Sequence, residues 1–143
     1  MKGFIKDIEE LTEDNDDFRR VLYTDKHLQL VLMTLKPSEE IGEEVHLNRD
    51  QFFRVEKGKG EAVIDGQRSK IKSDDAILVP AGARHNVINS VGDKPLRLYT
   101  LYGPPNHKDG TCGPQRLRPR LPRSISTGRP RSRHSAVTLC SAL

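Results

Sequence analysis

The sequence predicts an all-β fold, an antiparallel sandwich or barrel, of which a jelly roll is one form. Nine short apolar runs follow one another between residues 18 and 102, and no amphipathic helix of useful length separates them. Turn signals punctuate the runs. The strongest is Asp65-Gly66, because a tight hairpin turn requires positive φ at its centre. Regularly spaced short strands with such turns are typical of antiparallel sandwiches and barrels.

The elements are expected in the following order. Residues 5–12 can form a short helix, since Ile5, Ile8 and Leu11 recur at roughly helical spacing before the acidic run of residues 13–17 ends the pattern. Strands are expected at residues 18–23, 28–35, 41–47, 51–56, 61–64, 68–71, 76–79, 84–89 and 96–102.

A chain of 143 residues fits one domain, and its charge is unevenly distributed. The formal net charge is +4, but residues 1–110 hold 17 Lys and Arg against 20 Asp and Glu, whereas residues 111–143 hold seven arginines and no acid. The folded part is therefore mildly acidic, which argues against a nucleic-acid partner.

Residues 111–143 are rich in Arg, Pro and Ser and lack apolar periodicity, so we expect a disordered basic tail. Two interpretations remain open for it. The tail can be a basic arm for phosphate groups, or it can be a segment foreign to the domain that arose by out-of-frame translation or replacement.

Several features bear on location. Cys112 and Cys140 lie near the C-terminus and form neither a disulfide framework nor a zinc-knuckle spacing. The N-terminal residues lack the apolar segment of a secretory signal, and the longest apolar run, residues 30–33, is too short to span a membrane. We expect a soluble, cytoplasmic protein without membrane association.

The expected strand at residues 28–35 is apolar on both faces. One parity gives Leu28, Leu30 and Leu32, and the other gives Val31, Met33 and Leu35. Because an antiparallel sheet of a monomer usually has one wetted face, this pattern predicts a covering partner. We expect a homodimer through an outer sheet face.

Metal-ligating side chains are concentrated in two stretches. Glu44 and His46 are two residues apart, so a strand places both on one face, and Gln51 opens the next strand. Pro80 and Gly82 make a tight turn into a strand that carries His85. Donors from these stretches can converge on one point, and a metal ion is the simplest group to bind there.

These two stretches resemble the paired motifs of the cupin superfamily. The first family motif places His-x-His, a Glu and a Gly at spacings that are occupied here by Glu44, His46, Gln51 and Gly58. The second places Pro, Gly, His and Asn at spacings occupied by Pro80, Gly82, His85 and Asn89, with Asp74 where a glycine is expected. Residues 50–56 and 104–111 are also similar to small single-domain cupins labelled mannose-6-phosphate isomerase-like.

The resemblance covers roughly residues 28–103 and implies a double-stranded β-helix, the cupin barrel. It implies a cupin domain at residues 28–110, after an N-terminal segment of residues 1–27 and before the tail of residues 111–143. The family commonly offers three histidines and one carboxylate. This chain would instead offer Glu44, His46, Gln51 and His85, so that the single carboxylate has moved to the first ligand position. Such a set suits a divalent ion such as Fe, Mn, Zn, Ni or Co and leaves coordination positions for water or a ligand.

The site admits several functions. The resemblance implies a metal-dependent isomerase acting on a sugar or sugar phosphate, or a dioxygenase; the alternatives are a non-catalytic module that binds or senses a small molecule and a metal-free polar network. No residue stands out as a general base, so the catalytic residues are unknown. Phe53 and Tyr102 are candidate contacts for a small-molecule ligand, although aromatic residues of this kind more often serve packing. His107 can close the barrel mouth, although a histidine in such a loop is more often exposed.

Overall fold

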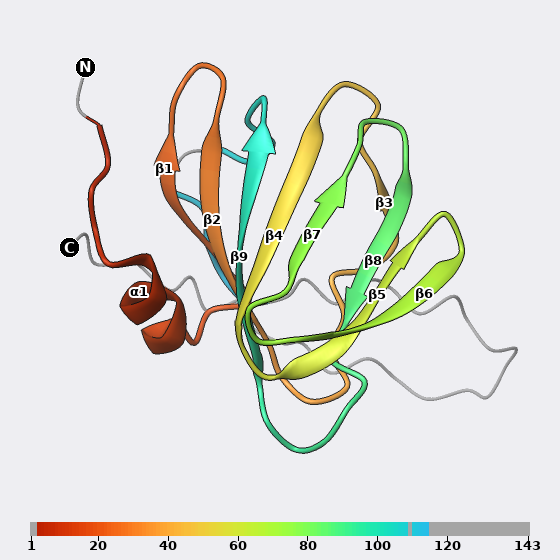
Figure 1. The fold of residues 1–143 in the computed structure, drawn as a ribbon. Helices are drawn as coiled ribbons and strands as arrows, with labels where there is room; N and C mark the ends of the chain where they lie inside the picture. Colours follow the sequence, from red (N-terminus) through yellow and green to blue (C-terminus); the bar gives the residue numbers. More distant parts are fainter. Residues whose placement is uncertain (1–2, 109, 115–143) are drawn as a thin grey trace, which may run out of the picture.

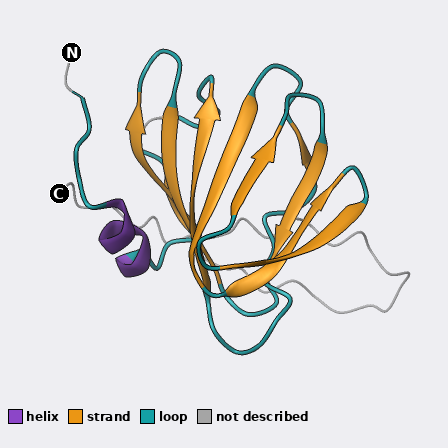
Figure 2. Ribbon diagram, in the orientation of Figure 1, coloured by secondary structure: helices purple, strands orange, loops and turns teal. Residues whose placement is uncertain are grey.

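The structure, a computed structural model, describes residues 3–108 and 110–114 as two antiparallel sheets and one short helix (Figures 1 and 2). The elements are α1 (Ile8–Asp14), β1 (Arg19–Thr24), β2 (Gln29–Leu35), β3 (Glu44–Val45), β4 (Asp50–Lys57), β5 (Lys59–Ile64), β6 (Gln67–Lys72), β7 (Ala76–Val79), β8 (Arg84–Ile88), β9 (Leu96–Gly103) and β10 (Cys112–Gly113).

The first sheet has six strands in the order β10-β1-β2-β9-β4-β7, and the second has four in the order β3-β8-β5-β6. Figure 1 shows the two sheets converging at one end and splaying apart at the other, where β4 and β8 begin and β9 ends. The predicted all-β jelly roll, a double-stranded β-helix, is confirmed.

The hydrophobic core fills the space between the sheets. Along β4 and β9, buried residues alternate with partly exposed ones, which is the period of a strand with one face inward. Phe53 and Val55 from β4 and Leu96 and Leu98 from β9 are fully buried in this core. The same parity of β4 and β9 directs Gln51 and Tyr102 inward at the splayed end.

The hairpin predicted at Asp65-Gly66 joins β5 to β6. Both residues have positive φ, 47° and 81°, and Ile64 pairs with Gln67 across the two-residue loop. This conformation matches the twist of the flanking strands, and glycine adopts it at little cost.

The helix begins at the N-cap Asp7, whose carboxylate accepts a hydrogen bond from the Glu10 N–H at 3.0 Å. It contacts β2, β4 and β9 of the six-stranded sheet. Asn15, which follows the helix, is bonded to Thr34 of β2. The Asn15 side-chain amide donates to the Thr34 hydroxyl at 3.0 Å, and this hydroxyl donates to the Asn15 backbone carbonyl at 2.6 Å. At seven residues, α1 is too short to cross a membrane, and no longer apolar helix occurs in the described part of the chain.

Every residue of β2 is buried, as the two-sided apolar pattern requires. Val31, Met33 and Leu35 belong to the inner core, while Leu30 and Leu32 have the opposite parity and lie outside the cluster. Contacts with the chain's own helix supply part of the cover on this side of the sheet. The apolar outer face of β2 is therefore explained in part within one chain, and the homodimer stays a prediction.

The expected strand at residues 41–47 is reduced to the two residues of β3. Ile41 donates to the Val87 carbonyl at 2.9 Å and thus already follows β8, but Gly42 has a φ of 93° and its N–H donates to the Asn86 side chain instead. The left-handed backbone at Gly42 interrupts the ladder, because a regular strand needs negative φ.

Both boundaries of the expected domain are crossed by strand pairing. The first strand, β1, precedes residue 28 and pairs with β2, while β10 pairs with β1 through Arg19 with Gly113 and Arg20 with Cys112. The tail expected to be disordered therefore contributes a short strand at its start. Residues 115–143, the remainder of that tail, lie outside the described residues, and the domain limits stay predictions.

Candidate metal site

Glu44 and His85 are brought together by the pairing of β3 with β8, in which they are directly opposite. Opposite residues of an antiparallel pair point to the same face, so both side chains face the other sheet. Val45, between Glu44 and His46, points away and is 40% exposed. His46 follows the end of β3 and is held by Gly82, whose N–H donates to the His46 carbonyl at 2.8 Å.

Gln51 reaches the same point from the six-stranded sheet. It lies opposite Val79 of β7 and Tyr102 of β9, and it is 2% exposed. Its amide nitrogen donates to the Thr100 hydroxyl at 3.0 Å, which leaves its oxygen Oε1 facing the Nε2 atom of His85 at 3.0 Å. The side chains at this point therefore come from both sheets.

The spacing of the four polar groups matches that of neighbouring ligands on one ion. Ligand atoms of Glu44, His46 and His85 all lie within 4.8 Å of one another. Glu44 Oε2 lies 3.3 Å from His46 Nε2, and His85 Nε2 lies 3.0 Å from Gln51 Oε1. Ligands at about 2.1 Å from an octahedral ion are separated by about 3 Å when adjacent.

The hydrogen bonding of these groups is incomplete without a cation. Glu44 Oε2 and His46 Nε2 are buried, and apart from their mutual contact at 3.3 Å neither has a partner among the described residues. His85 faces oxygen atoms at both ring nitrogens, the Ala83 carbonyl at 3.2 Å from Nδ1 and the Gln51 oxygen at Nε2. A neutral imidazole has one N–H, so one of these contacts lacks a hydrogen. A metal ion among the four groups accepts the unused lone pairs, and the residues therefore fit a divalent ion.

Burial lowers the pKa of His46, and the proximity of His85 and Arg49 acts in the same direction, while Glu44 opposes it. The lowered pKa favours the neutral imidazole at neutral pH. Neutral imidazole is the form that binds metals, because the ligating nitrogen must be free of its proton.

Tyr102 and His107 flank the ligand set. The fully buried Tyr102 ring meets His46 edge-on at 5.8 Å between ring centres and meets His107 at 5.1 Å, with its hydroxyl 3.3 Å from His107 Nε2. Burial, followed by the Glu44 charge, raises the pKa of Tyr102. Burial, followed by the Arg19 charge, lowers the pKa of His107 to about 4. At neutral pH, the phenol keeps its proton and the imidazole is uncharged.

The other residues singled out from the sequence are placed as follows. Phe53 is fully buried in the hydrophobic core, with its ring 6.1 Å from that of His85, so it packs behind the site. His107 was expected either to close the barrel mouth or to be exposed; it is half-buried because the loop folds back onto Tyr102.

Two groups near the site were missed by sequence reasoning. Arg19 of β1 lies with Nη2 4.0 Å from Glu44 Oε1, and Gln29 of β2 fixes the loop that carries His107. A parity shared with core residue Val21 is a signal that Arg19 points inward, but its approach to Glu44 depends on how the sheets pack.

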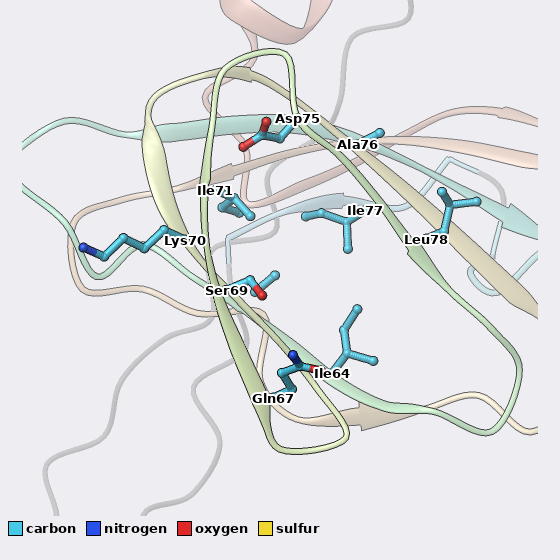
Figure 3. Close-up of a pocket in the computed structure, with 10 residues that line it drawn as sticks. Ile64, Gln67, Ser69, Lys70, Ile71, Asp75, Ala76, Ile77 and Leu78 are labelled. Atoms are coloured by element: carbon cyan, nitrogen blue, oxygen red, sulfur yellow. The ribbon is translucent and has the colours of Figure 1, made fainter.

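A separate groove of about 460 Å³ opens between β6 and β7, the edges of the two sheets (Figure 3). Ile64, Ile71 and Ile77 form its apolar side. None of the four candidate ligands lines it, although Ile64 lies opposite His85 in the pairing of β5 with β8. The groove and the candidate metal site are thus distinct.

Comparison with known proteins agrees with this geometry. A family model described as "Cupin domain" matches residues 31–102. The protein YrkC of Bacillus subtilis is 46% identical over 118 residues, which are 77% of this chain and 62% of that protein. The chain thus spans less than two thirds of that relative's length.

Solved structures share the fold. The crystal structure of BH2720 from Bacillus halodurans has a TM-score of 0.76 and 42% identity, and the match covers 78% of this chain and 89% of that one. A predicted oxalate decarboxylase from Thermotoga maritima has a TM-score of 0.52 and 22% identity over 55% of this chain and 67% of its own, which shows likeness of fold alone. Since the family model covers half of the chain and includes Glu44, His46, Gln51 and His85, the chain belongs to the cupin family.

Proposed function

We propose that Glu44, His46 and His85 bind a divalent metal ion, with Gln51 as a fourth donor, and that the protein uses this site to hold a small oxygen-bearing molecule. The observation that supports it is that Glu44 Oε2 and His46 Nε2 are buried, face each other at 3.3 Å and have no further partner among the described residues. A cation between them would engage a lone pair of each atom, so the arrangement favours an ion.

When bound, the ion supplies Lewis acidity toward an oxygen atom of the ligand. Two histidines and one carboxylate are typical of Fe(II) sites, and Mn, Co, Ni and Zn accept the same donors. Glu44 contributes the negative charge, and neutral His46 contributes a lone pair. Gln51 contributes a carbonyl oxygen and holds it in place through Thr100.

We further propose isomerase-type chemistry on a sugar or sugar phosphate as the activity of this site. Its support is the hydrogen-bonded pair of Tyr102 and His107 beside His46. With its hydrogen on Nε2, the neutral His107 donates to the phenol oxygen and leaves the Tyr102 O–H free to donate to a ligand oxygen, so the pair suits a reaction in which a proton moves on the ligand. Dioxygenase activity and non-catalytic binding are the competing outcomes.

The metal site is tested by elemental analysis of protein purified without an affinity tag. Wild type should retain about one equivalent of a transition metal, and His46→Ala and His85→Ala should lose most of it. His27→Ala is the matched control, because His27 is exposed and lies outside the site. Equal metal content in wild type and all three variants would falsify the proposal. In that case the side-chain amide of Gln51 would be flipped, so that its NH₂ group donates to His85 Nε2 in a metal-free network.

The reaction is tested separately on the metal-loaded protein. Interconversion of aldose and ketose phosphates followed by NMR supports isomerisation, provided that Tyr102→Phe reduces the rate without changing metal content. Oxygen consumption with turnover indicates a dioxygenase. A small molecule that binds the loaded protein and is recovered unchanged indicates a binding module.

A further inference from the structure

Arg19 occupies a position from which it can contact a ligand of the candidate metal site. It lies in β1, the strand next to the edge strand β10 of the six-stranded sheet. It precedes the core residue Val21 by two residues, so its side chain points between the sheets. Its guanidinium approaches Glu44 with Nη2 at 4.0 Å from Oε1, while the other oxygen of Glu44 lies beside His46. Its side chain retains 23% exposure, so the group borders the opening between the sheets.

The hydrogen-bonding capacity of Arg19 is largely unused. Its Nε is buried and has no hydrogen-bond partner among the described residues, and the 4.0 Å contact with Glu44 is too long for a hydrogen bond. The other nearby arginines differ. Arg20 pairs with Asp17 at 3.4 Å, and Arg49 donates to the backbone of Pro105 and to the side chain of Asn106.

The charges around this group favour an anion. The positive charges of Arg19 and Arg49 both contribute to lowering the pKa of His107. Glu44 is the carboxylate that lies against Arg19. A divalent ion adds two further positive charges. Positive charge in a partly buried site attracts anions strongly, because solvent screens it less than at the surface.

We propose that Arg19 binds an anionic oxygen group, a carboxylate or a phosphate, of the small molecule held at this site. The planar guanidinium donates from Nε and a terminal nitrogen to two oxygens of such a group, which is the geometry that Arg recognises best. The ligand class is thus a small oxygen-bearing acid or phosphate ester. The inference rests on the proposed function for the placement of the ligand beside the ion, while the contact with Arg19 needs no ion.

The test uses the full chain in its metal-free form, labelled with ¹⁵N. Sodium acetate and inorganic phosphate are titrated separately at constant ionic strength, and the Nε–Hε cross peak of Arg19, assigned by its absence in Arg19→Gln, is followed. We expect a saturable shift of this peak with at least one of the two anions. The anion that saturates at lower concentration identifies the group as carboxylate or phosphate. Because Arg19→Gln lacks this peak, its affinity and that of wild type are compared through the backbone amide peaks of Glu44 and His46. A charge-assisted hydrogen bond predicts a loss of affinity on the order of tenfold in Arg19→Gln.

Arg20→Gln is the matched control, because it removes the same charge from the next residue, which pairs with Asp17 on the other face of the strand. Unchanged anion affinity in Arg19→Gln, or equal losses in the two variants, overturns the proposal. Metal content of Arg19→Gln is measured in parallel. Loss of metal with unchanged anion affinity also overturns it, since Arg19 would then only orient Glu44. Absence of metal from wild type refutes the metal site but leaves the anion titration valid.

Discussion

The side-chain amide of Gln29 holds both backbone groups of His107. It donates to the His107 carbonyl at 2.8 Å and accepts from the His107 N–H at 2.8 Å, and it also accepts from the Asn106 N–H at 3.0 Å. Gln29 is fully buried at the start of β2. The Gln29 side chain thus makes the backbone hydrogen bonds that a neighbouring strand would otherwise make to the loop beside the candidate site.

Replacement of Gln29 by Leu should destabilise the protein and release this loop. Two backbone donors and one acceptor lose their partners, so we expect a loss of about 2–4 kcal/mol in the free energy of unfolding. Urea denaturation measures the loss, and hydrogen exchange at Asn106 and His107 should become faster. Gln67→Leu, at an exposed position, is the control and should change stability by about 0.5 kcal/mol or less. Unchanged exchange at both amides in Gln29→Leu would contradict this role.

Replacement of Gln51 by Glu should strengthen metal binding. The neutral carbonyl oxygen becomes a carboxylate, a stronger ligand for a divalent ion, and we expect affinity to rise about tenfold or more by competition with a chelating dye. The metal-free variant should be less stable than wild type by about 1–3 kcal/mol, because a buried carboxylate next to Glu44 lacks a cation. Gln51→Leu should lower both the metal affinity and the stability of the metal-free protein. Equal metal affinity in all three proteins would show that Gln51 is not a ligand.

The stability of the metal-free protein should fall as the pH is lowered from about 6.5 to about 4. The pKa of His107 is lowered to about 4 in the folded state, so in this window the unfolded chain takes up the proton first. The slope per histidine is at most about 1.4 kcal/mol per pH unit, and solvent screening at this half-buried position reduces it. The lowered pKa of His46 acts in the same direction.

Urea denaturation at pH 7, 6 and 5 in the presence of a chelator measures this dependence. His107→Gln should flatten it, while His27→Gln should leave it as in wild type. Identical slopes in all three proteins would exclude His107 as a source.

Two glycines distinguish the cost of a strained backbone from the cost of a steric clash. Gly58 and Gly66 both have positive φ, 98° and 81°, but a Cβ on Gly58 would lie 2.5 Å from the Pro95 carbonyl oxygen, whereas a Cβ on Gly66 would meet nothing within 4 Å. Gly66→Ala should therefore cost about 1 kcal/mol, and Gly58→Ala about 3 kcal/mol or more. Thermal and urea denaturation of the two variants gives the comparison, and equal losses would mean that the β4–β5 corner relaxes away from Pro95.

We propose that the homodimer forms through the outer face of the six-stranded sheet. Leu78 of β7 is 73% exposed there and pairs with Phe52, which in turn pairs with Leu101. Light scattering at micromolar concentration should give twice the chain mass for wild type and a lower mass for Leu78→Asp. Ile5→Asp, at a position that is 94% exposed in the N-terminal segment, should leave the mass unchanged. A monomeric mass for wild type would contradict the proposed homodimer.

The sequence predicted those parts of the fold that depend on local patterns. The strand at Ala76–Val79 and the turn at Asp65-Gly66 follow from alternation and from residues that tolerate positive φ. The motif spacing placed Glu44, His46 and His85 within reach of one another. The strand and the turn are encoded within a few neighbouring residues, whereas the approach of His85 to Glu44 and His46 was predicted from the resemblance to the paired cupin motifs.

The features that were missed depend on residues far apart in the chain. The contact of Arg19 with Glu44 joins strands of two different sheets, and the Gln29–His107 bonds span 78 residues. No local pattern marks such contacts. Likewise, the outer face of β2 looked unpartnered because nothing in its own sequence says that α1 packs on this sheet.

Because Gln51 comes from one sheet and Glu44 and His85 from the other, an ion bound between them would tie the sheets together at their splayed end. Binding to the folded state alone adds stability with ion concentration, about 2.7 kcal/mol at a hundredfold excess over Kd. Metal supply would then set the lifetime of the protein in a cell. When the ion is scarce, the sheets would separate more often and expose the chain to proteases, so the abundance of the protein would follow metal availability even at a constant rate of synthesis.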